Sequence, residues 1–80
     1  MLISDSQVIL ESFGLVVKKY RTLLGLSQKE LALTCRLNIN YIGNIERGKS
    51  NVTLITLLKI SKHLGISSER LIREMDFFLG

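Results

Sequence analysis

One short pattern recurs along this chain of 80 residues, and four of its copies lie 11 to 15 residues apart. In each copy an apolar residue is followed at once by Ser, Asn or Thr, and a second apolar residue lies five positions after the first. The pattern is typical of a helix N-terminus, where the polar side chain accepts a hydrogen bond from a free backbone N–H and the apolar pair packs across it. These four copies are Leu26-Ser27 with Leu31, Leu37-Asn38 with Ile42, Val52-Thr53 with Leu57, and Ile66-Ser67 with Leu71. They predict helices that start at Ser27, Asn38, Thr53 and Ser67.

A further helix is expected before the first copy. We expect it to begin at Asp5 or Ser6, to run to Leu24 and to stop at Gly25, which can adopt the left-handed conformation of a helix C-cap. Its apolar residues recur at helical spacing. They are Ile9, Phe13, Val16, Val17, Tyr20 and Leu24.

The expected helix ends complete the fold prediction. The second helix is expected to end by about Cys35 or Arg36, the third near Arg47-Gly48 and the fourth at Leu64-Gly65, while the fifth runs from Ser68 to about Leu79. The chain contains no Pro. We therefore predict an all-α fold of five helices, in a single domain over residues 1–80.

Composition narrows the class of protein. The single cysteine, Cys35, cannot form an intrachain disulfide and indicates a reducing compartment, so we expect a cytoplasmic location. With one histidine, His63, it cannot build a structural zinc site, and no cofactor is expected. No apolar run approaches the ~18 residues of a membrane span, and no signal peptide is predicted.

The second and third helices, at about residues 27–47, are short and joined by a tight turn. Such a pair crosses at a large angle, which is helix-turn-helix geometry. We expect the inner faces of the pair to be formed by Leu31, Ala32, Leu37, Ile42 and Ile45. The outer face of the third helix then carries Ile39, Asn40, Gly43, Asn44 and Arg47.

This outer face and its surroundings suit double-stranded DNA. The formal net charge of +4 favours a polyanionic partner, and an α-helix fits the major groove of B-DNA. We expect base contacts from Ile39, Asn40 and Asn44, since Asn can pair with adenine. Phosphate contacts are expected from Gln28, Tyr41, Arg47, Lys49, Ser50 and Asn51.

Three blocks resemble the Cro/C1-type (XRE) helix-turn-helix family. They run from Gly25 to Ala32, from Tyr41 to Gly48 and from Thr56 to Ser67, and the resemblance covers about residues 13–75. It implies a lambda-repressor-like fold and a buried structural ion pair between Arg21 and Glu46.

Within that family, the stretch from Asn38 to Leu54 is most similar to the controller proteins of restriction-modification systems. Those proteins are homodimers that bind operators upstream of their own genes and of the endonuclease genes. Many of them carry Asp-Arg-Thr-Tyr where this chain has Asn38-Ile39-Asn40-Tyr41. The arginine that would read guanine is Ile39 here, which can touch a thymine methyl instead. The operator sequence therefore cannot be transferred from those relatives.

The fifth helix, at about residues 68–79, carries more apolar surface than a small domain is expected to bury. We predict that this surface is a dimer interface between two copies related by two-fold symmetry. Two recognition helices would then lie about one DNA turn, roughly 34 Å, apart. The residues expected in the interface are Leu71, Ile72, Met75, Phe78 and Leu79, with Phe77 widening it.

Together these features predict a homodimeric transcriptional regulator that binds a roughly palindromic operator. RNA polymerase is a further candidate partner, while no membrane or small-molecule ligand is expected. The sequence shows no catalytic constellation, so an enzyme is not predicted. Two other readings remain open: a phage-type repressor or the antitoxin of a toxin–antitoxin pair, and a protein-interaction adaptor that keeps the fold without binding DNA.

Overall fold

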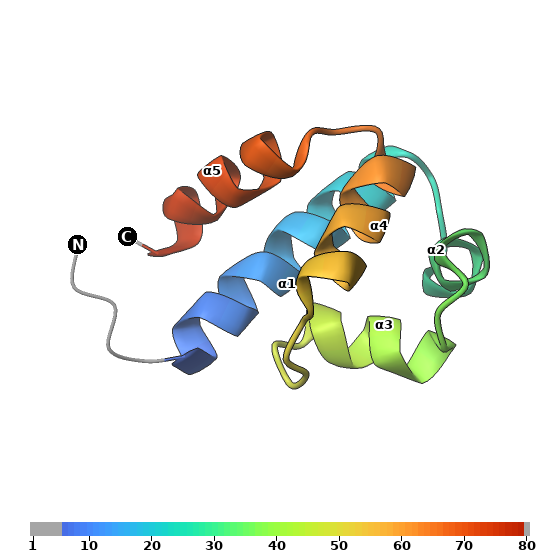
Figure 1. The fold of residues 1–80 in the computed structure, drawn as a ribbon, viewed down its shortest axis with the longest axis horizontal. Helices are drawn as coiled ribbons and strands as arrows, with labels where there is room; N and C mark the ends of the chain where they lie inside the picture. Colours follow the sequence, from blue (N-terminus) through green and yellow to red (C-terminus); the bar gives the residue numbers. More distant parts are fainter. Residues whose placement is uncertain (1–5, 80) are drawn as a thin grey trace.

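The computed structural model describes residues 6–79, and the regular elements in this range are all helices. They are α1 (Ser6–Leu23), α2 (Gln28–Cys35), α3 (Ile39–Glu46), α4 (Leu54–Leu64) and α5 (Ser68–Leu79). The predicted all-α fold of five helices is confirmed. Figure 1 shows that α1 runs through the middle of the molecule, with α5 on one side of it and α3 on the other.

The capping residues predicted from the repeated pattern all act as caps. In each case the side-chain oxygen accepts a hydrogen bond from a backbone N–H of the first helical turn. The pairs are Ser27 with Glu30 N–H (3.0 Å), Asn38 with Asn40 N–H (2.7 Å), Thr53 with Thr56 N–H (3.1 Å) and Ser67 with Arg70 N–H (3.0 Å). The Glu30 carboxylate also accepts from the Ser27 N–H, which lowers the pKa of that carboxyl. These caps explain why the predicted helix starts are correct.

Two helix ends add information that the pattern did not provide. Helix α1 ends at Leu23, one residue earlier than expected, and Leu24 is 52% exposed, so it does not belong to the apolar face. The chain turns there because Gly25 takes a positive φ of 71°. The alternative N-terminal residue, Asp5, lies outside the described residues. At the end of α2, Arg36 adopts a left-handed φ of 56°, which is costly for a residue with a Cβ.

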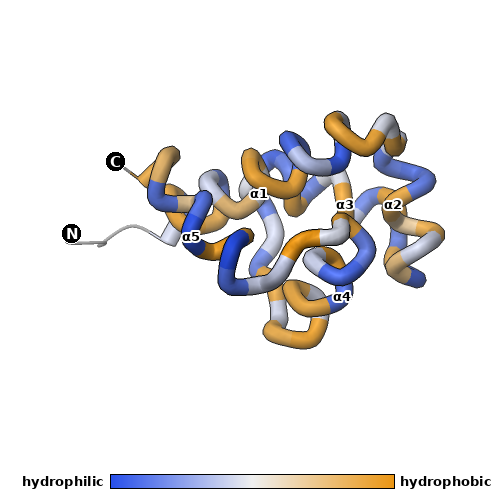
Figure 2. Tube along the Cα trace, turned by 90° about the horizontal axis from the view of Figure 1, so that it is seen from above, coloured by the Kyte–Doolittle hydropathy of each residue, from blue (hydrophilic) through white to orange (hydrophobic). Residues whose placement is uncertain are grey.

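The hydrophobic core lies where α1 meets α3, α4 and α5, and α2 closes it through its contacts with α3 and α4. Its buried residues come from every helix and alternate with polar positions, as Figure 2 shows along α1 and α5. They are Phe13, Val16, Val17, Leu31, Ala32, Cys35, Ile42, Ile45, Ile60, Leu64, Leu71 and Met75. Because each helix buries one stripe, the five helices share one core.

Helix α5 is anchored on α1 through one carboxylate. Glu74 accepts hydrogen bonds from Lys19 Nζ at 2.9 Å, from the Tyr20 hydroxyl, and from Arg70 Nε at 3.1 Å. These donors, Lys19 first and then Tyr20, lower the pKa of Glu74 to about 2. The carboxylate therefore stays charged and ties α5 to α1 over the whole physiological pH range.

The apolar residues of α5 divide between the core and the surface. Leu71 is fully buried and Met75 is 8% exposed, both inside the monomer. The expectation that these two lie in a dimer interface is therefore wrong, because α1 and the core already cover them. Ile72 is 51% exposed, Phe78 43% and Phe77 83%, while Leu79 is half-buried, so these four remain available to a partner.

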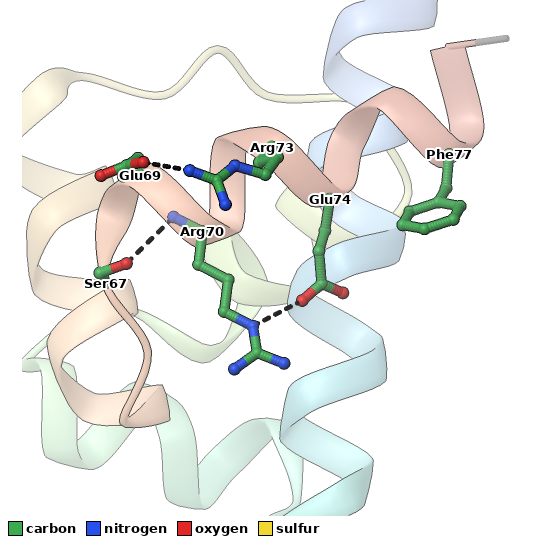
Figure 3. A pocket seen from close by; sticks show the side chains of 6 residues that line it. All are labelled: Ser67, Glu69, Arg70, Arg73, Glu74 and Phe77. Carbon is green, nitrogen blue, oxygen red and sulfur yellow. Dashed lines mark hydrogen bonds and ion pairs between the residues drawn. The ribbon is translucent and has the colours of Figure 1, made fainter.

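Charged side chains line one flank of α5. Figure 3 shows Arg70 reaching Glu74 and Arg73 reaching Glu69 along the same helix, beside a shallow hollow of about 440 Å³ that Phe77 borders. No helix in the described part of the chain is both long and apolar enough to cross a membrane.

Candidate nucleic-acid interface

The two helices of the helix-turn-helix are locked together by their inner faces. Leu31 and Ala32 of α2 and Ile42 and Ile45 of α3 are buried, and Leu37 in the turn packs against them. Leu37 N–H also donates to the Ala32 carbonyl at 2.8 Å, which closes the turn. This packing leaves the opposite face of α3 pointing away from the core.

An ion pair fixes α3 against α1. Arg21 donates from Nε to Glu46 Oε2 at 2.6 Å and from Nη2 to Glu46 Oε1 at 3.0 Å, and the two side chains are only 11% and 3% exposed. The same Glu46 Oε1 accepts from Gln28 Nε2 at 3.0 Å, at the start of α2. One carboxylate therefore sets the positions of α1, α2 and α3, as a buried pair with good geometry can.

A close backbone contact reinforces this arrangement. A Cβ atom on Gly14 of α1 would lie 2.3 Å from the carbonyl oxygen of Ile45 and 2.7 Å from that of Glu46. Only a residue without a side chain lets α1 approach the end of α3 so closely. No local pattern around Gly14 signals a contact with residues 31 and 32 positions away, so this glycine is not among the predicted site residues.

The outer face of α3 presents polar and apolar groups to solvent. Ile39 is 44% exposed, Asn40 and Arg47 are exposed, and Asn44 is half-buried. Arg47 Nη2 donates to the Asn44 side-chain oxygen at 2.6 Å. The spacing of Asn44 and Arg47, three apart on a helix, is the signal that would have predicted this bond.

The loop after α3 is held close to the end of that helix. Lys49 N–H donates to the Asn44 carbonyl at 2.8 Å, and the Tyr41 hydroxyl donates to the Asn51 carbonyl at 3.1 Å. Lys49 and Asn51 are exposed, and Ser50 is half-buried. The structure thus brings the expected base-contact and phosphate-contact residues of α3 and its loop onto one region, with Gln28 of α2 beside them.

The stretch of chain that contains this region carries an excess of positive charge. Between residues 31 and 68 the only carboxylate is that of Glu46, which the Arg21 guanidinium already neutralises. The same stretch contains Arg36, Arg47, Lys49, Lys59 and Lys62. The net positive charge therefore lies with the helix-turn-helix and α4, as expected for a surface that meets phosphate.

Residue types that ligate metal ions are scattered over the described part of the chain. Residues 6–79 contain no cluster of His, Cys, Asp and Glu that could hold a metal ion. Cys35 is buried in the core, and this burial raises the pKa of its thiol, so it is a packing residue.

Comparison with known proteins agrees with this geometry. The family model described as helix-turn-helix matches residues 17–71. The control protein C.BamHI of Bacillus amyloliquefaciens is 43% identical over 61 residues, which cover 75% of this chain and 75% of that protein.

Two solved structures have the same fold. The restriction-modification controller protein C.AhdI from Aeromonas hydrophila is 40% identical, with a TM-score of 0.76 over 79% of this chain and 96% of that one. The controller protein C.Esp1396I, described as a tetramer in complex with its natural 35 base-pair operator, is 37% identical, with a TM-score of 0.73 over 84% of this chain and 93% of that one. The resemblance stated from the sequence is confirmed: this chain belongs to the helix-turn-helix family and, within it, to the control proteins of restriction-modification systems.

Proposed function

We propose that this protein is a sequence-specific DNA-binding transcriptional regulator, the controller of a restriction-modification system. The observation that carries the proposal is the outer face of α3. That face is largely exposed, lies in the stretch of residues 31–68 that carries the excess of positive charge, and is fixed in orientation by the pair of Arg21 and Glu46. Its relative C.Esp1396I is described in complex with operator DNA. The role is regulatory rather than enzymatic, and it places the protein in the cytoplasm with the DNA.

In this proposal α3 enters the major groove. Ile39, Asn40 and Asn44 contact base edges, because the N-terminal half of a recognition helix reaches deepest into the groove. The groups around them contact phosphates, which set the register and supply the affinity. These are Gln28, Tyr41, Arg47, Lys49, Ser50 and Asn51.

The protein acts as a homodimer on a roughly palindromic operator. The side chains that support this part of the proposal are Ile72, Phe78 and Leu79 of α5, which the monomer leaves uncovered or half-covered. Phe77 is also exposed, but it lies beside Arg73 rather than beside Ile72. Ile72 also lines an apolar groove of about 290 Å³ with Val52 and Leu57. Apolar side chains left exposed beside one another are typical of partner surfaces. RNA polymerase is a further proposed partner at the promoter.

Selection of bound duplexes from a random pool, followed by titrations at several salt concentrations, tests the proposal. We expect one enriched sequence with two-fold symmetry, and an affinity that falls steeply with salt, by ~0.9 in log K per phosphate neutralised for each tenfold rise in salt. Sedimentation should show a dimer, and replacing Ile72 and Phe78 by Asp should give monomers that bind operator weakly.

The absence of an enriched sequence, or binding that does not respond to salt, would exclude the regulator and favour an adaptor that keeps the fold. If a toxin gene, rather than genes for an endonuclease and a methyltransferase, lies beside this gene, an antitoxin role is favoured over the controller role.

A further inference from the structure

Arg36, in the turn between α2 and α3, has a backbone conformation that its side chain makes unfavourable. Its φ of 56° and ψ of 44° lie in the left-handed region. In that region a Cβ atom comes too close to the following carbonyl oxygen, whereas glycine adopts the same conformation without this penalty. Within residues 6–79, Arg36 is the only residue other than glycine with a positive φ. The turn would therefore be more stable with glycine at this position.

The turn uses only backbone atoms of Arg36. Its N–H donates to the Leu33 carbonyl at 3.2 Å, and the Leu37 N–H donates to the Ala32 carbonyl at 2.8 Å. Both bonds can form with glycine at position 36, because neither needs a side chain there. Arg36 is also exposed, so its side chain does not fill the core. The fold of the monomer therefore gives no reason for an arginine in this turn.

The guanidinium of Arg36 differs from those of the other arginines in its lack of a partner. The other four each donate to a carboxylate or a side-chain amide of the same chain; they are Arg21, Arg47, Arg70 and Arg73. Within residues 6–79, no hydrogen bond or ion pair engages the side chain of Arg36. All five of its N–H donors are therefore available to a partner outside the chain.

The position of the turn relative to α3 indicates the class of this partner. The turn lies at the N-terminal end of α3, and the loop after α3 lies at the opposite end (Figure 1). The expected cationic phosphate contacts, Arg47 and Lys49, belong to the C-terminal end, and Arg36 is the only basic residue between positions 31 and 46. Eight residues of α-helix span about 12 Å, close to the ~12 Å width of the major groove. Groups at both ends of α3 can therefore reach phosphates that border the groove.

We propose that Arg36 is a further phosphate-binding residue of the DNA interface, at the N-terminal end of α3. This inference rests on the proposed function. A planar guanidinium with free donors matches a phosphate, which can accept two of its N–H groups. A contact to DNA accounts for an arginine where the backbone favours glycine, since strained residues of this kind are found at functional sites.

The test measures the affinity for the operator at several salt concentrations, with the operator taken as the duplex that the wild-type protein enriches from a random pool. Arg36→Gln removes the charge and keeps the Cβ, Arg36→Gly also relieves the backbone, and Arg36→Lys keeps the charge. The control is Lys62→Gln, which removes another exposed cation that forms no ion pair within residues 6–79. Lys62 is in the last turn of α4, at the end of that helix away from α3 in Figure 1.

We expect Arg36→Gln and Arg36→Gly to make the dependence of log K on log salt less steep by ~0.9 for each bound copy of the chain, the value of one phosphate contact. Between 1 M and 0.1 M salt, this difference amounts to a roughly eightfold loss of affinity per copy. Arg36→Lys and Lys62→Gln should keep the steepness of the wild-type protein. No variant should change a base preference, because phosphates carry no sequence information.

Thermal melting separates a contact to DNA from a structural role. Arg36→Gly should melt at a higher temperature than the wild-type protein and yet bind the operator more weakly. A side chain that only supported the fold would lose stability and affinity together.

The inference is overturned if Arg36→Gln and Arg36→Gly keep the salt dependence of the wild-type protein, or if Lys62→Gln reduces it equally, since total charge alone would then explain the effect. In both cases sequence-specific, salt-dependent binding would persist in the wild-type protein, and the proposed function would stand. A wild-type protein that enriches no duplex would remove the proposed function and this inference together.

Discussion

The inner face of α3 touches backbone and buried charge, whereas its outer face touches only flexible side-chain ends. On the inner face Ile45 and Glu46 meet the backbone of Gly14 and the guanidinium of Arg21, and a Cβ atom on Gly14 would lie 2.3 Å from the Ile45 carbonyl oxygen. On the outer face the atoms nearest to a Cβ on Gly43 would be the side-chain tips of Arg47 and Gln28. The residues of the inner face therefore fix the orientation of α3, whereas those of the outer face determine which partner α3 contacts.

The largest effect is expected from breaking the inner ion pair. Glu46→Ala leaves the Arg21 guanidinium buried without its partner, and we expect a loss of ~3–5 kcal/mol in the free energy of unfolding, measured by urea denaturation. The control is Glu69→Ala, which removes the exposed pair with Arg73 and should cost less than ~1 kcal/mol. Similar losses in the two variants would show that Glu46 does not organise the three helices.

A methyl group on the inner face tests the close backbone contact. In Gly14→Ala the new Cβ meets the carbonyl oxygens of Ile45 and Glu46, neither of which can turn aside, so α1 and α3 must separate. We expect a loss of ~3 kcal/mol, at the upper end of the range for overpacked cores, and a lower melting temperature. An unchanged melting temperature would mean that α1 can move away from α3 at little cost.

Arg36, the residue with a left-handed backbone conformation between α2 and α3, is a site where a substitution should increase stability. Arg36→Gly removes the Cβ that makes a φ of 56° unfavourable, and the free energy of unfolding should rise by ~1 kcal/mol. Arg36→Ala is the matched control, since it removes the same charge but keeps the Cβ. Equal gains in the two variants would assign the effect to charge rather than to backbone conformation.

The same methyl group on the outer face should stabilise the protein slightly. Gly43→Ala adds a better helix former, and its Cβ displaces only the mobile end of Arg47, so we expect a gain of ~0.5–1 kcal/mol in thermal or urea unfolding. A loss comparable to that of Gly14→Ala would erase the distinction between the two faces.

The smallest effect is expected where α1 meets α5. The pKa of Glu74 is lowered in the folded protein from 4.5 to about 2, so the folded state favours the ionised form. The stability that this provides is fully present above about pH 4.5 and is lost as the pH falls toward 2. Urea denaturation at several pH values between 4.5 and 2 should show the free energy of unfolding of the wild-type protein falling with pH, and the fall should be shallower in Glu74→Gln. The same pH dependence in both proteins would show that Glu74 does not contribute to the loss of stability.

The parts of the fold that depend on neighbouring residues were predictable from the sequence. Ser27, Asn38, Thr53 and Ser67 cap their helices because a cap needs only a side-chain oxygen and the N–H groups a few residues ahead. The five helices and their order follow from those local signals.

The parts that depend on distant residues could not be predicted in the same way. Gly14 matters because of a backbone that arrives from α3, and Leu71 and Met75 are core rather than surface because α1 lies over them. The expected contacts to DNA remain predictions. The structure adds the hydrogen-bond partners of these residues, which a list of exposed residues does not contain. Asn40 and Asn44 are the same residue type with different partners.

Gly14 and Arg21 both face α3, and they lie seven positions apart, which is two helical turns less about 20°. Tyr20, one position before Arg21, turns to the other neighbour, α5. A single-residue insertion or deletion between Gly14 and Tyr20 would rotate Gly14 by about 100° relative to Tyr20 and Arg21. Gly14 and Arg21 could then no longer face α3 while Tyr20 faces α5. Between Gly14 and Tyr20, α1 can therefore accept substitutions in evolution but not insertions or deletions. The outer face of α3 carries no such constraint, so substitutions there can change the operator sequence that the protein recognises.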